Sequence, residues 1–483
     1  MKKLRWRLFL GLTLVIMIFI QIAVCYGKEN IMTIRVMDYS DSTKAIREEF
    51  YRNYMKSHPN IKIEYTQLTI DQLKNTILTA VKSNDVPDLF SLPVGMNLAS
   101  MVADGWFQPM NRYLDKQVIN SFIDGTFIEG TTMIKGKIYG FPEWMDLPST
   151  ALFYNKKLFK EAGLDPEKPP KTHSEFREYA KKITAAGKGK YYGFIEGGKQ
   201  INRWKNMIQD WSSLGGSGLN LNSPASLATG KVTYDSKAVL ELFQLFKGLV
   251  DDKSIHPYTM NISAPEARAL FGQGQAGFIE QGSWCISTWG KDNPDLEFGV
   301  APPPVPDEGR KGSIALFTPK AWVGLSAKSK HPKEAMELLK AQYSIHGGYQ
   351  SKVVENGMFF SAVKGVNDQY LKNAQLMAYY KVMASYGRFA PDPMVRNPEI
   401  AKVYEEIKDV HPSVAELLQG TMVGAINDPA AELKKLSQKS QAELVRAVEA
   451  AQAKGAKVKL TDFKFSNWDP MKDYVAKDYK AVK

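Results

Sequence analysis

Hydrophobic positions near the start of the chain recur with two periods, which predict strands and helices in alternation. Apolar residues in the segments 32–37 and 61–65 predict strands, and helical spacing in the segments 46–55 and 73–81 predicts amphipathic helices. A third short strand is expected to begin at Pro87. The order strand, helix, strand, helix, strand is typical of a parallel α/β layer.

The same alternation resumes in the middle of the chain and predicts a second layer. Thr172 with Glu175, and Ser263 with Glu266, match the capping box that opens a helix. Strands are predicted at 151–154, 192–195 and 276–280, and helices at 156–162, 172–186, 240–249 and 263–271. The second layer is therefore expected to mix strands and helices like the first.

The last part of the chain and the overall composition complete this prediction. From Lys364 onward the pattern is mostly helical and includes a long amphipathic helix over 430–451. The chain has 483 residues, more than a usual single domain, and its 44% hydrophobic and 24% charged content is that of a folded globular protein. The predicted fold class is α/β, with two α/β lobes and a helical C-terminal portion.

Charge and cysteine usage exclude several classes of function. The net charge is +12, but no run of Lys and Arg is longer than three, so a nucleic-acid-binding face is not indicated. Two cysteines exclude a disulfide framework, and six histidines show no metal-ligand spacing. We therefore expect no metal, no cofactor and no nucleic-acid partner.

The N-terminus predicts export. Basic residues precede an apolar run over 8–24, as in a secretory signal peptide. Ile22-Ala23-Val24-Cys25 resembles the lipobox of bacterial lipoproteins, in which Cys25 would carry lipid, although Val24 stands where the pattern has Gly, Ala or Ser. Ordinary cleavage after Cys25 and a retained membrane anchor remain alternatives. In each case the mature chain is expected to work outside the cytoplasmic membrane.

No motif designates a catalytic residue. Gly272-x-Gly274-x-x-Gly277 has the letters of the dinucleotide fingerprint, but a helix is predicted before it and a strand after it, the reverse of what phosphate binding needs. The sequence has no phosphate-binding loop ending in Gly-Lys-Ser/Thr, no Gly-x-Ser-x-Gly and no His-Glu-x-x-His. The glycines are better explained by a tight turn between helix and strand.

Tryptophans beside acids and amides are the positive signal. Trp144, Trp211 and Trp284, three of nine in the chain, have Glu, Asp or Gln as near neighbours. An exposed indole ring can stack on the apolar face of a pyranose, while acids and amides bind the hydroxyl groups. For each tryptophan taken alone, packing in the core is an equally good explanation.

Several segments together resemble one family. They are Gly136-Lys137-Ile138-Tyr139-Gly140-Phe141-Pro142, Leu152-Phe153-Tyr154-Asn155-Lys156, Phe271-x-x-Gly274-x-Ala276 with Gly282-x-Trp284, and Phe298-Gly299-Val300-Ala301. This set resembles the family 1 extracellular solute-binding proteins of ABC transporters, of the maltodextrin-binding type and its larger oligosaccharide-binding members. The resemblance implies the bilobed type II periplasmic-binding-protein fold, with a hinge that closes on ligand.

The resemblance also implies domain boundaries and a ligand site. The boundaries are a signal peptide at 1–25, an N-terminal lobe at 30–144 and 317–357, a C-terminal lobe at 148–312 and 361–460, and an extension at 461–483. The ligand-binding residues implied by position are Trp284, Asp146, Trp144, Trp211, Glu196 and Asp41. Trp468, in the extension, is expected to pack that tail onto a lobe.

The resulting expectation is a monomeric, non-catalytic receptor. It would bind a carbohydrate, as an oligosaccharide, and deliver it to ABC permease subunits from the outer face of the cytoplasmic membrane or the periplasm. One alternative keeps the fold but changes the ligand to a non-sugar solute. The other is a secreted glycoside hydrolase, which needs two carboxylates roughly 5 to 10 Å apart; the sequence designates no such pair.

Overall fold

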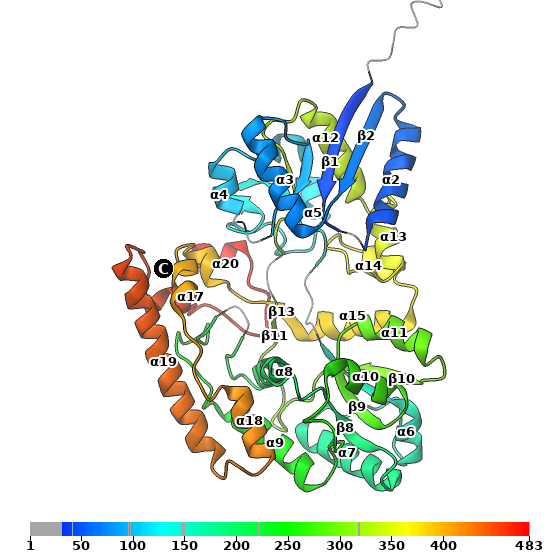
Figure 1. The fold of residues 1–483 in the computed structure, drawn as a ribbon, viewed down its shortest axis with the longest axis vertical. Helices are drawn as coiled ribbons and strands as arrows, with labels where there is room; N and C mark the ends of the chain where they lie inside the picture. Colours follow the sequence, from blue (N-terminus) through cyan, green and yellow to red (C-terminus); the bar gives the residue numbers. More distant parts are fainter. Residues whose placement is uncertain are drawn as a thin grey trace, which may run out of the picture.

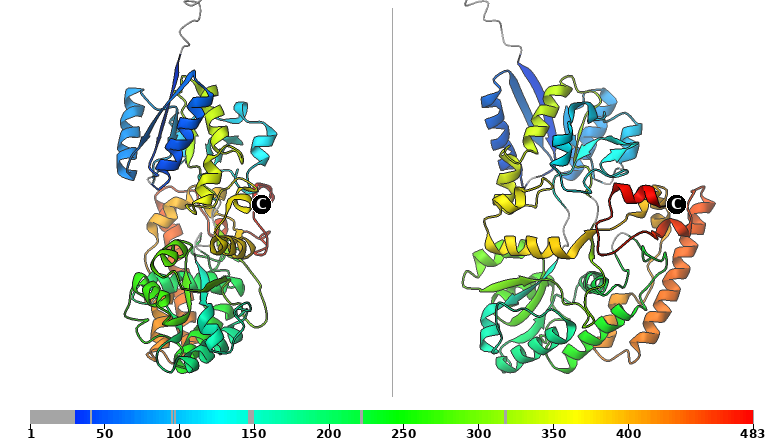
Figure 2. Two further views of the ribbon diagram at one scale, coloured as in Figure 1. Left: turned by 90° about the vertical axis from the view of Figure 1, so that its right-hand side faces the viewer. Right: turned by 180° about the vertical axis from the view of Figure 1, so that it is seen from behind.

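The computed structural model describes residues 31–482 except 41, 95, 97, 146–149, 221–222 and 317–318. Within this part, the chain forms two lobes, one above the other, and each contains its own sheet (Figure 1). The same two bodies are seen from the side and from behind (Figure 2). The expected bilobed α/β fold is confirmed.

The first lobe contains a five-stranded sheet in the order β2-β1-β3-β12-β6. Its strands are β1 (Met32–Asp38), β2 (Ile61–Gln67), β3 (Leu89–Ser91), β6 (Gly140–Phe141) and β12 (Val323–Leu325). β1 runs parallel to β2 and β3, whereas β12 is antiparallel to β3 and β6. The three strands predicted from the first hundred residues therefore lie side by side, and the last two positions are filled by distant segments. A separate hairpin joins β4 (Met133–Ile134) and β5 (Lys137–Ile138).

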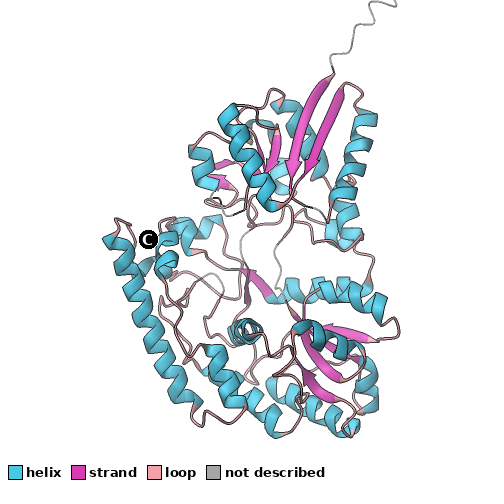
Figure 3. Cartoon of the chain, in the orientation of Figure 1, coloured by secondary structure: helices cyan, strands magenta, loops and turns pink. Residues whose placement is uncertain are grey.

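Helices cover both faces of this sheet (Figure 3). They are α2 (Lys44–Ser57), α3 (Ile70–Ser83), α4 (Leu98–Ala103), η1 (Asn111–Tyr113), α5 (Lys116–Asn120), α12 (Pro332–Gln342), α13 (Tyr349–Glu355) and α14 (Val366–Tyr370). The predicted apolar face of α2 buries Phe50, Tyr51 and Tyr54 in the main core of the lobe. Thr69 and Gln72 form a complete capping box at the start of α3.

The second lobe contains a four-stranded sheet in the order β10-β7-β9-β8. The strands are β7 (Ala151–Asn155), β8 (Tyr192–Ile195), β9 (Ala276–Gln281) and β10 (Phe298–Ala301). β8 and β9 are parallel, and β7 is antiparallel to both of its neighbours. All residues of β7 and β9 are buried, because helices pack on both sides of the sheet.

The four helices predicted for the second lobe are present as α6 (Lys156–Glu161), α7 (His173–Gly187), α9 (Lys237–Asp251) and α10 (Ala264–Gly272). The lobe also contains α8 (Ile201–Leu214) and α11 (Trp284–Asp292), for which no bounds were predicted. Ser263 and Glu266 form the predicted capping box in full. At α7, Thr172 caps the helix, but the Glu175 carboxylate accepts from the Lys171 backbone N–H, one residue earlier than expected.

The glycine-rich segment is a helix-to-strand turn, as the sequence indicated. α10 ends at Gly272 and β9 begins at Ala276. Gly274 has a φ of +77°, which favours glycine, and a Cβ on Gly277 would lie 2.6 Å from the Ile183 side chain. Turn geometry and close packing therefore explain these glycines, because no helix N-terminus follows them.

Helices also dominate the C-terminal part of the second lobe. They are α15 (Ala374–Tyr386), α16 (Pro393–Arg396), α17 (Ile400–Glu406), α18 (Val414–Met422), α19 (Pro429–Ala453), η2 (Leu460–Phe463) and α20 (Ala476–Ala481). The prediction missed one short parallel pair, β11 (Ile314–Leu316) with β13 (Gly387–Phe389). Three-residue strands carry too little periodicity to be recognised in a helical region. Among the described residues, no helix has both the length and the apolar character needed to cross a bilayer.

The chain passes between the lobes at three places. These passages lie between β6 and β7, between β11 and β12, and between α14 and α15 (Figure 1). Val366 and Leu371 pack in the core of the first lobe, so the third passage comes later than the boundary expected at 357–361. The other predicted boundaries stay a prediction. In the tail, Phe465 and Tyr474 are buried against Leu227, and Trp468 packs on the same cluster.

Candidate functional site

A cavity of about 600 Å³ lies where the two lobes meet. The described part of its first-lobe wall is formed by Tyr39 and by residues 92–94, 96, 98–99, 130–131, 143–144 and 319–322. Its second-lobe wall is formed by Asp392, Met394, Val395 and Pro398, in and around α16. We call it the interlobe cavity. Its volume is in the range of small-ligand sites, which are commonly found between lobes or domains.

Three aromatic side chains form a continuous row along the first-lobe wall. The ring centroids of Tyr39 and Trp322 are 4.4 Å apart, and those of Trp322 and Trp144 are 5.1 Å apart. Tyr39 follows β1, Trp144 comes shortly after β6, and Trp322 precedes the antiparallel β12, so the sheet brings all three to one edge. Trp144 is 43% exposed, which leaves part of its indole ring open to a ligand. We call Tyr39, Trp322 and Trp144 the aromatic row.

One buried arginine holds both ends of this row. The Arg47 Nε lies 2.9 Å from Asp38 Oδ2, and the Arg47 Nη2 donates to the Glu143 carboxylate. Asp38 directly precedes Tyr39, and Glu143 directly precedes Trp144. A single guanidinium therefore fixes the two chain segments that present the outer aromatic rings of the row.

The surroundings of Arg47 exclude water from these ion pairs and add hydrogen bonds to Glu143. Tyr343 and Tyr349 both donate to Glu143, at 2.9 Å from Tyr343. Burial raises the pKa of both tyrosines well above the ordinary value, so the hydroxyls stay protonated as donors. Burial alone would lower the pKa of Arg47, but Glu143 raises it well above the ordinary range. Such a cluster is rigid, because loss of one partner leaves a buried charge unpaired.

Of the sequence-predicted residues that the structure describes, Trp144 alone lines the interlobe cavity. Trp284, at the start of α11, is 49% exposed but lies outside that cavity. Its ring lies over Gly282, where an added Cβ would come within 2.0 Å of the ring, so glycine is required there. Asp146 and Asp41, like the lipidation residue Cys25, lie outside the described residues.

The structure places Trp211 and Glu196 inside the second lobe. Trp211 is fully buried in its core, with its ring 5.7 Å from that of Phe176. Glu196 is also fully buried and accepts from Arg203 at 2.9 and 3.1 Å. The amphipathic pattern of α8 turns Trp211 toward the core, and the Arg203 partner explains how Glu196 is accommodated without a ligand. Neither side chain lines the interlobe cavity.

Two further acids are buried near the end of the second-lobe sheet. Burial raises the pKa of Glu280 to about 8 and that of Asp210 to about 7. The Thr150 hydroxyl donates to Glu280 Oε1 at 2.6 Å, whereas Arg203 is committed to Glu196. At neutral pH, Glu280 is therefore mostly protonated, unlike the ion-paired acids of the first lobe. Within the described part of the chain, no three His, Cys, Asp or Glu side chains gather where they would hold a metal ion.

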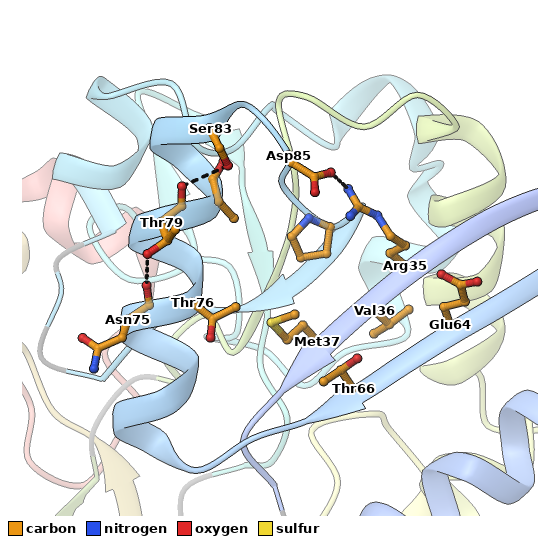
Figure 4. Close-up of a pocket in the computed structure, with 12 residues that line it drawn as sticks. Arg35, Val36, Met37, Glu64, Thr66, Asn75, Thr76, Thr79, Ser83 and Asp85 are labelled. Atoms are coloured by element: carbon orange, nitrogen blue, oxygen red, sulfur yellow. Dashed lines mark hydrogen bonds and ion pairs between the residues drawn. The ribbon is translucent and has the colours of Figure 1, made fainter.

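A groove on the outer part of the first lobe is a weaker candidate. It has a volume of about 560 Å³ and lies between β1, β2 and α3 (Figure 4). Some of its polar groups are already used, since Thr79 and Ser83 donate to backbone carbonyls of their own helix at 2.9 and 3.1 Å. Arg35 is likewise paired with Asp85 at 2.9 Å. The described lining of this groove contains no aromatic side chain.

Sequence reasoning missed four residues of the site. Tyr39, Trp322, Arg47 and Asp392 were not singled out, although Tyr39 directly follows a predicted strand, where ligand residues often lie. Arg47 follows the apolar Ile46 on a predicted buried helix face, and a charged residue at that place is a signal for a buried partner. Trp322 and Asp392 carry no comparable local signal.

Comparison with known proteins agrees with the fold and the cavity. The family model described as bacterial extracellular solute-binding protein matches residues 39–345. A Brucella abortus relative described as a binding protein is 26% identical over 85% of this chain and 92% of its own length. An ABC transporter extracellular-binding protein of Pyrococcus horikoshii is 25% identical over 65% of this chain and 69% of its own.

A solved structure shows the same fold. The cyclic α-maltosyl-1,6-maltose binding protein from Arthrobacter globiformis superposes with a TM-score of 0.58 at 18% identity, over 86% of this chain and 99% of that one. The first-lobe residues that line the interlobe cavity, from Tyr39 to Trp322, lie within the range matched by the family model, whereas α16 lies beyond it.

Proposed function

Because this chain belongs to the bacterial extracellular solute-binding proteins, we propose that it is the receptor of an ABC importer for an oligosaccharide. The ligand is held in the interlobe cavity and passed to the permease subunits. The aromatic row is the observation that carries this proposal, since it offers a sugar-binding surface at the meeting of the two lobes.

The chemistry of the cavity suits a saccharide. A pyranose has an apolar C–H face, which stacks on an indole ring, and a rim of hydroxyls, which needs donors and acceptors. Trp144 supplies the open ring, and the buried indole N–H of Trp322 has no hydrogen-bond partner among the described residues. Asp392 and Lys320 line the same cavity and provide an acceptor and a donor of opposite charge. Trp284, Asp146 and Asp41 remain candidate contacts in the closed form.

The mechanism is closure of the lobes around the ligand. The rigid Arg47 cluster presents the aromatic row before the ligand arrives, so little ordering is needed on the first-lobe side. The second lobe then closes by rotation about the three passages, and the closed form docks on the permease. A ligand that shifts the population from 1:99 to 99:1 must bind the closed form about 10⁴-fold more tightly.

The protein acts without catalysis, as a monomer outside the cytoplasmic membrane. Both oxygens of Glu143 accept hydrogen bonds from Arg47 or tyrosines, and Asp392 Oδ1 caps α16 through Met394 N–H. Neither acid of the cavity is arranged as a free general acid, which favours binding over hydrolysis. Lipid on Cys25 would retain the receptor at the membrane, and intact-mass measurement of the native protein tests this modification.

Calorimetric titration against neutral and uronic-acid oligosaccharides tests the proposed function. We expect saturable one-to-one binding of at least one oligosaccharide, with no release of reducing ends on long incubation. Heat from a non-sugar solute alone would contradict the carbohydrate ligand. Release of new reducing ends would contradict the non-catalytic role and favour a glycoside hydrolase.

A further inference from the structure

A second cavity, of about 460 Å³, lies within the second lobe and adjoins the interlobe cavity. Its walls come from the helices α8, α17, α18 and α19 and from residues 219–220 and 223–224. The four helices surround this region in Figure 1. Asp392 and Met394 line both cavities, so the short helix α16 and its cap form the wall between them. The two cavities therefore lie next to each other, on either side of Asp392 and Met394.

The walls of the second cavity are held in place by specific bonds. The Glu443 carboxylate on α19 accepts from the backbone N–H of Lys408 at 2.7 Å, which ties the segment after α17 to α19. Arg446 saturates the same carboxylate, and this bonding lowers the pKa of Glu443 to about 2. On the opposite wall, the neighbours of Tyr234 are anchored to α19, since Val232 N–H and Asp235 N–H donate to its side chains at 3.0 and 2.9 Å.

Within this fixed frame, several polar groups are not used by the protein. Gln209, on α8, is 7% exposed, and its Nε2 donates to the Asn220 carbonyl at 3.3 Å. Its Oε1 has no hydrogen-bond partner among the described residues, although an unpaired buried amide oxygen is costly. Lys205 and Lys408 also line the cavity, and in the described part of the chain neither ammonium forms an ion pair.

Aromatic rings stand beside these polar groups. Tyr234 and Tyr404 line the cavity from opposite sides, and Tyr404 is supported by an edge contact with Phe463 at 6.2 Å. Aromatic faces, a directed amide oxygen and mobile ammonium donors are the same combination that suits a sugar in the interlobe cavity. The outer groove of Figure 4 lacks this combination, because its described lining contains no aromatic side chain.

We infer that the second cavity binds the distal sugar units of the oligosaccharide whose other end occupies the interlobe cavity. This inference rests on the proposed function and adds to it a preference for length. The interlobe cavity is sufficient for a short saccharide, and a longer chain gains contacts with Gln209 and Tyr234 beyond the Asp392 wall. The receptor therefore discriminates by chain length through a site on one lobe only.

Calorimetric titration of size-graded saccharides tests this inference. The probes are malto-, manno- and xylo-oligosaccharides from disaccharide to hexasaccharide, and the series that binds the wild type best is used with the variants. Gln209→Met removes the unpaired oxygen at nearly constant volume, and Tyr234→Phe keeps the ring but removes its hydroxyl. Matched controls are Gln438→Met and Tyr258→Phe, which change exposed residues outside both cavities.

We expect wild-type affinity to rise with chain length, and each cavity variant to weaken the longest saccharide by about tenfold, the equivalent of one good hydrogen bond. The same variants bind the disaccharide within about twofold of wild type, and the controls bind all lengths as wild type does. Equal loss at every length, or no loss at any length, overturns the second site while the proposed function stands. If no saccharide binds the wild type, both fall together.

Discussion

The two lobes bury acidic residues near the cleft in opposite ways. In the first lobe, Asp38 and Glu143 form ion pairs with Arg47. In the second lobe, burial raises the pKa of Glu280 to about 8 and of Asp210 to about 7, which favours the protonated forms, while the neighbouring Glu196 is ion-paired with Arg203. The first arrangement fixes neighbouring aromatic side chains by charge, whereas the second keeps two of its buried acids nearly neutral.

The tryptophans follow the same division. In the first lobe, Trp144 stays open to the interlobe cavity, beside the ion pairs. In the second lobe, Trp211 is sealed in the core, and Trp284 is open but outside the cavity. The difference teaches that the first lobe carries a preformed binding surface, while the second lobe contributes when the cleft closes. The following changes test that comparison, from the largest expected effect to the smallest.

Arg47→Met is expected to have the largest effect, because it leaves two buried carboxylates without a cation. We expect it to lower the free energy of unfolding by about 3–5 kcal/mol, measured by chemical denaturation. Arg177→Met is the matched control, since its partner Asp252 lies near the surface and such pairs are worth about 0–1 kcal/mol. A loss below about 1 kcal/mol for Arg47→Met would show that the cluster does not hold the first lobe together.

Glu280→Gln tests the neutral acids of the second lobe through pH. The folded pKa of Glu280 lies above its unfolded value of 4.5, so the folded state binds the extra proton. Wild-type stability from this group is therefore lost as pH rises from about 4.5 to about 8. Glu280→Gln has no carboxyl group to ionise and so lacks this loss. The free energy of unfolding of the variant, relative to that of wild type, should therefore increase over that pH window by on the order of 3 kcal/mol.

Denaturation series at several pH values measure this difference, with the exposed Glu64→Gln as control. A constant difference between Glu280→Gln and wild type across the window would mean that Glu280 is ionised in the folded protein. The second lobe would then resemble the first, and the contrast between them would be lost.

Trp144→Ala removes the open ring of the aromatic row. Loss of one stacking indole from a binding site is worth about 2 kcal/mol, so we expect about thirtyfold weaker binding of the preferred saccharide. Calorimetry measures the change, and Trp144→Phe should recover part of the affinity. If Trp144→Ala binds the saccharide as tightly as wild type does, the claim that the first lobe provides the main binding surface is contradicted.

Trp284→Ala is expected to weaken the same saccharide by about tenfold, less than Trp144→Ala. The ring is half exposed in this structure and gains its ligand contact only when the lobes close, so part of the interaction offsets the closing motion. Calorimetric titration of Trp144→Ala and Trp284→Ala with the same saccharide shows which variant loses more affinity. A larger loss for Trp284→Ala would reverse the roles assigned to the lobes.

Trp211→Phe is expected to leave saccharide binding unchanged and so comes last in this series. The side chain is fully buried among Phe176 and Phe246, so shortening it should lower the free energy of unfolding by about 1–2 kcal/mol and leave affinity unchanged. Paired denaturation and titration separate the two readouts. Weakened binding without loss of stability would bring Trp211 back as a ligand contact.

The fold was predictable because strong periodic segments determine it. The buried positions of β1, β2 and α2, the capping box at Ser263 and the N-cap at Thr172 follow directly from local patterns. β12 and β13 were not predictable in the same way, since three residues show no period and their pairing depends on distant strands. Long-range pairing is a tertiary property that a local window does not contain.

The site was predictable only in part, for a related reason. Trp144 stands in a loop beside acids, which predicted an exposed ring, and the side chain is exposed and lines the interlobe cavity. Its contact with a ligand stays a prediction. Trp211 has similar neighbours in sequence, but the helical turn of α8 directs it to the core. Arg47 and Trp322 act through partners that are far away along the chain. The apolar face of α2 indicates that Arg47 is buried but not which acids it pairs with, and no nearby residue indicates the role of Trp322.

A crystal structure of the complex with the tightest-binding oligosaccharide tests the central claim most directly. The account predicts a closed form in which one pyranose ring stacks on Trp144 and the chain contacts the segment around Asp392. A saccharide bound away from the interlobe cavity, or lobes that stay apart around it, would contradict the account.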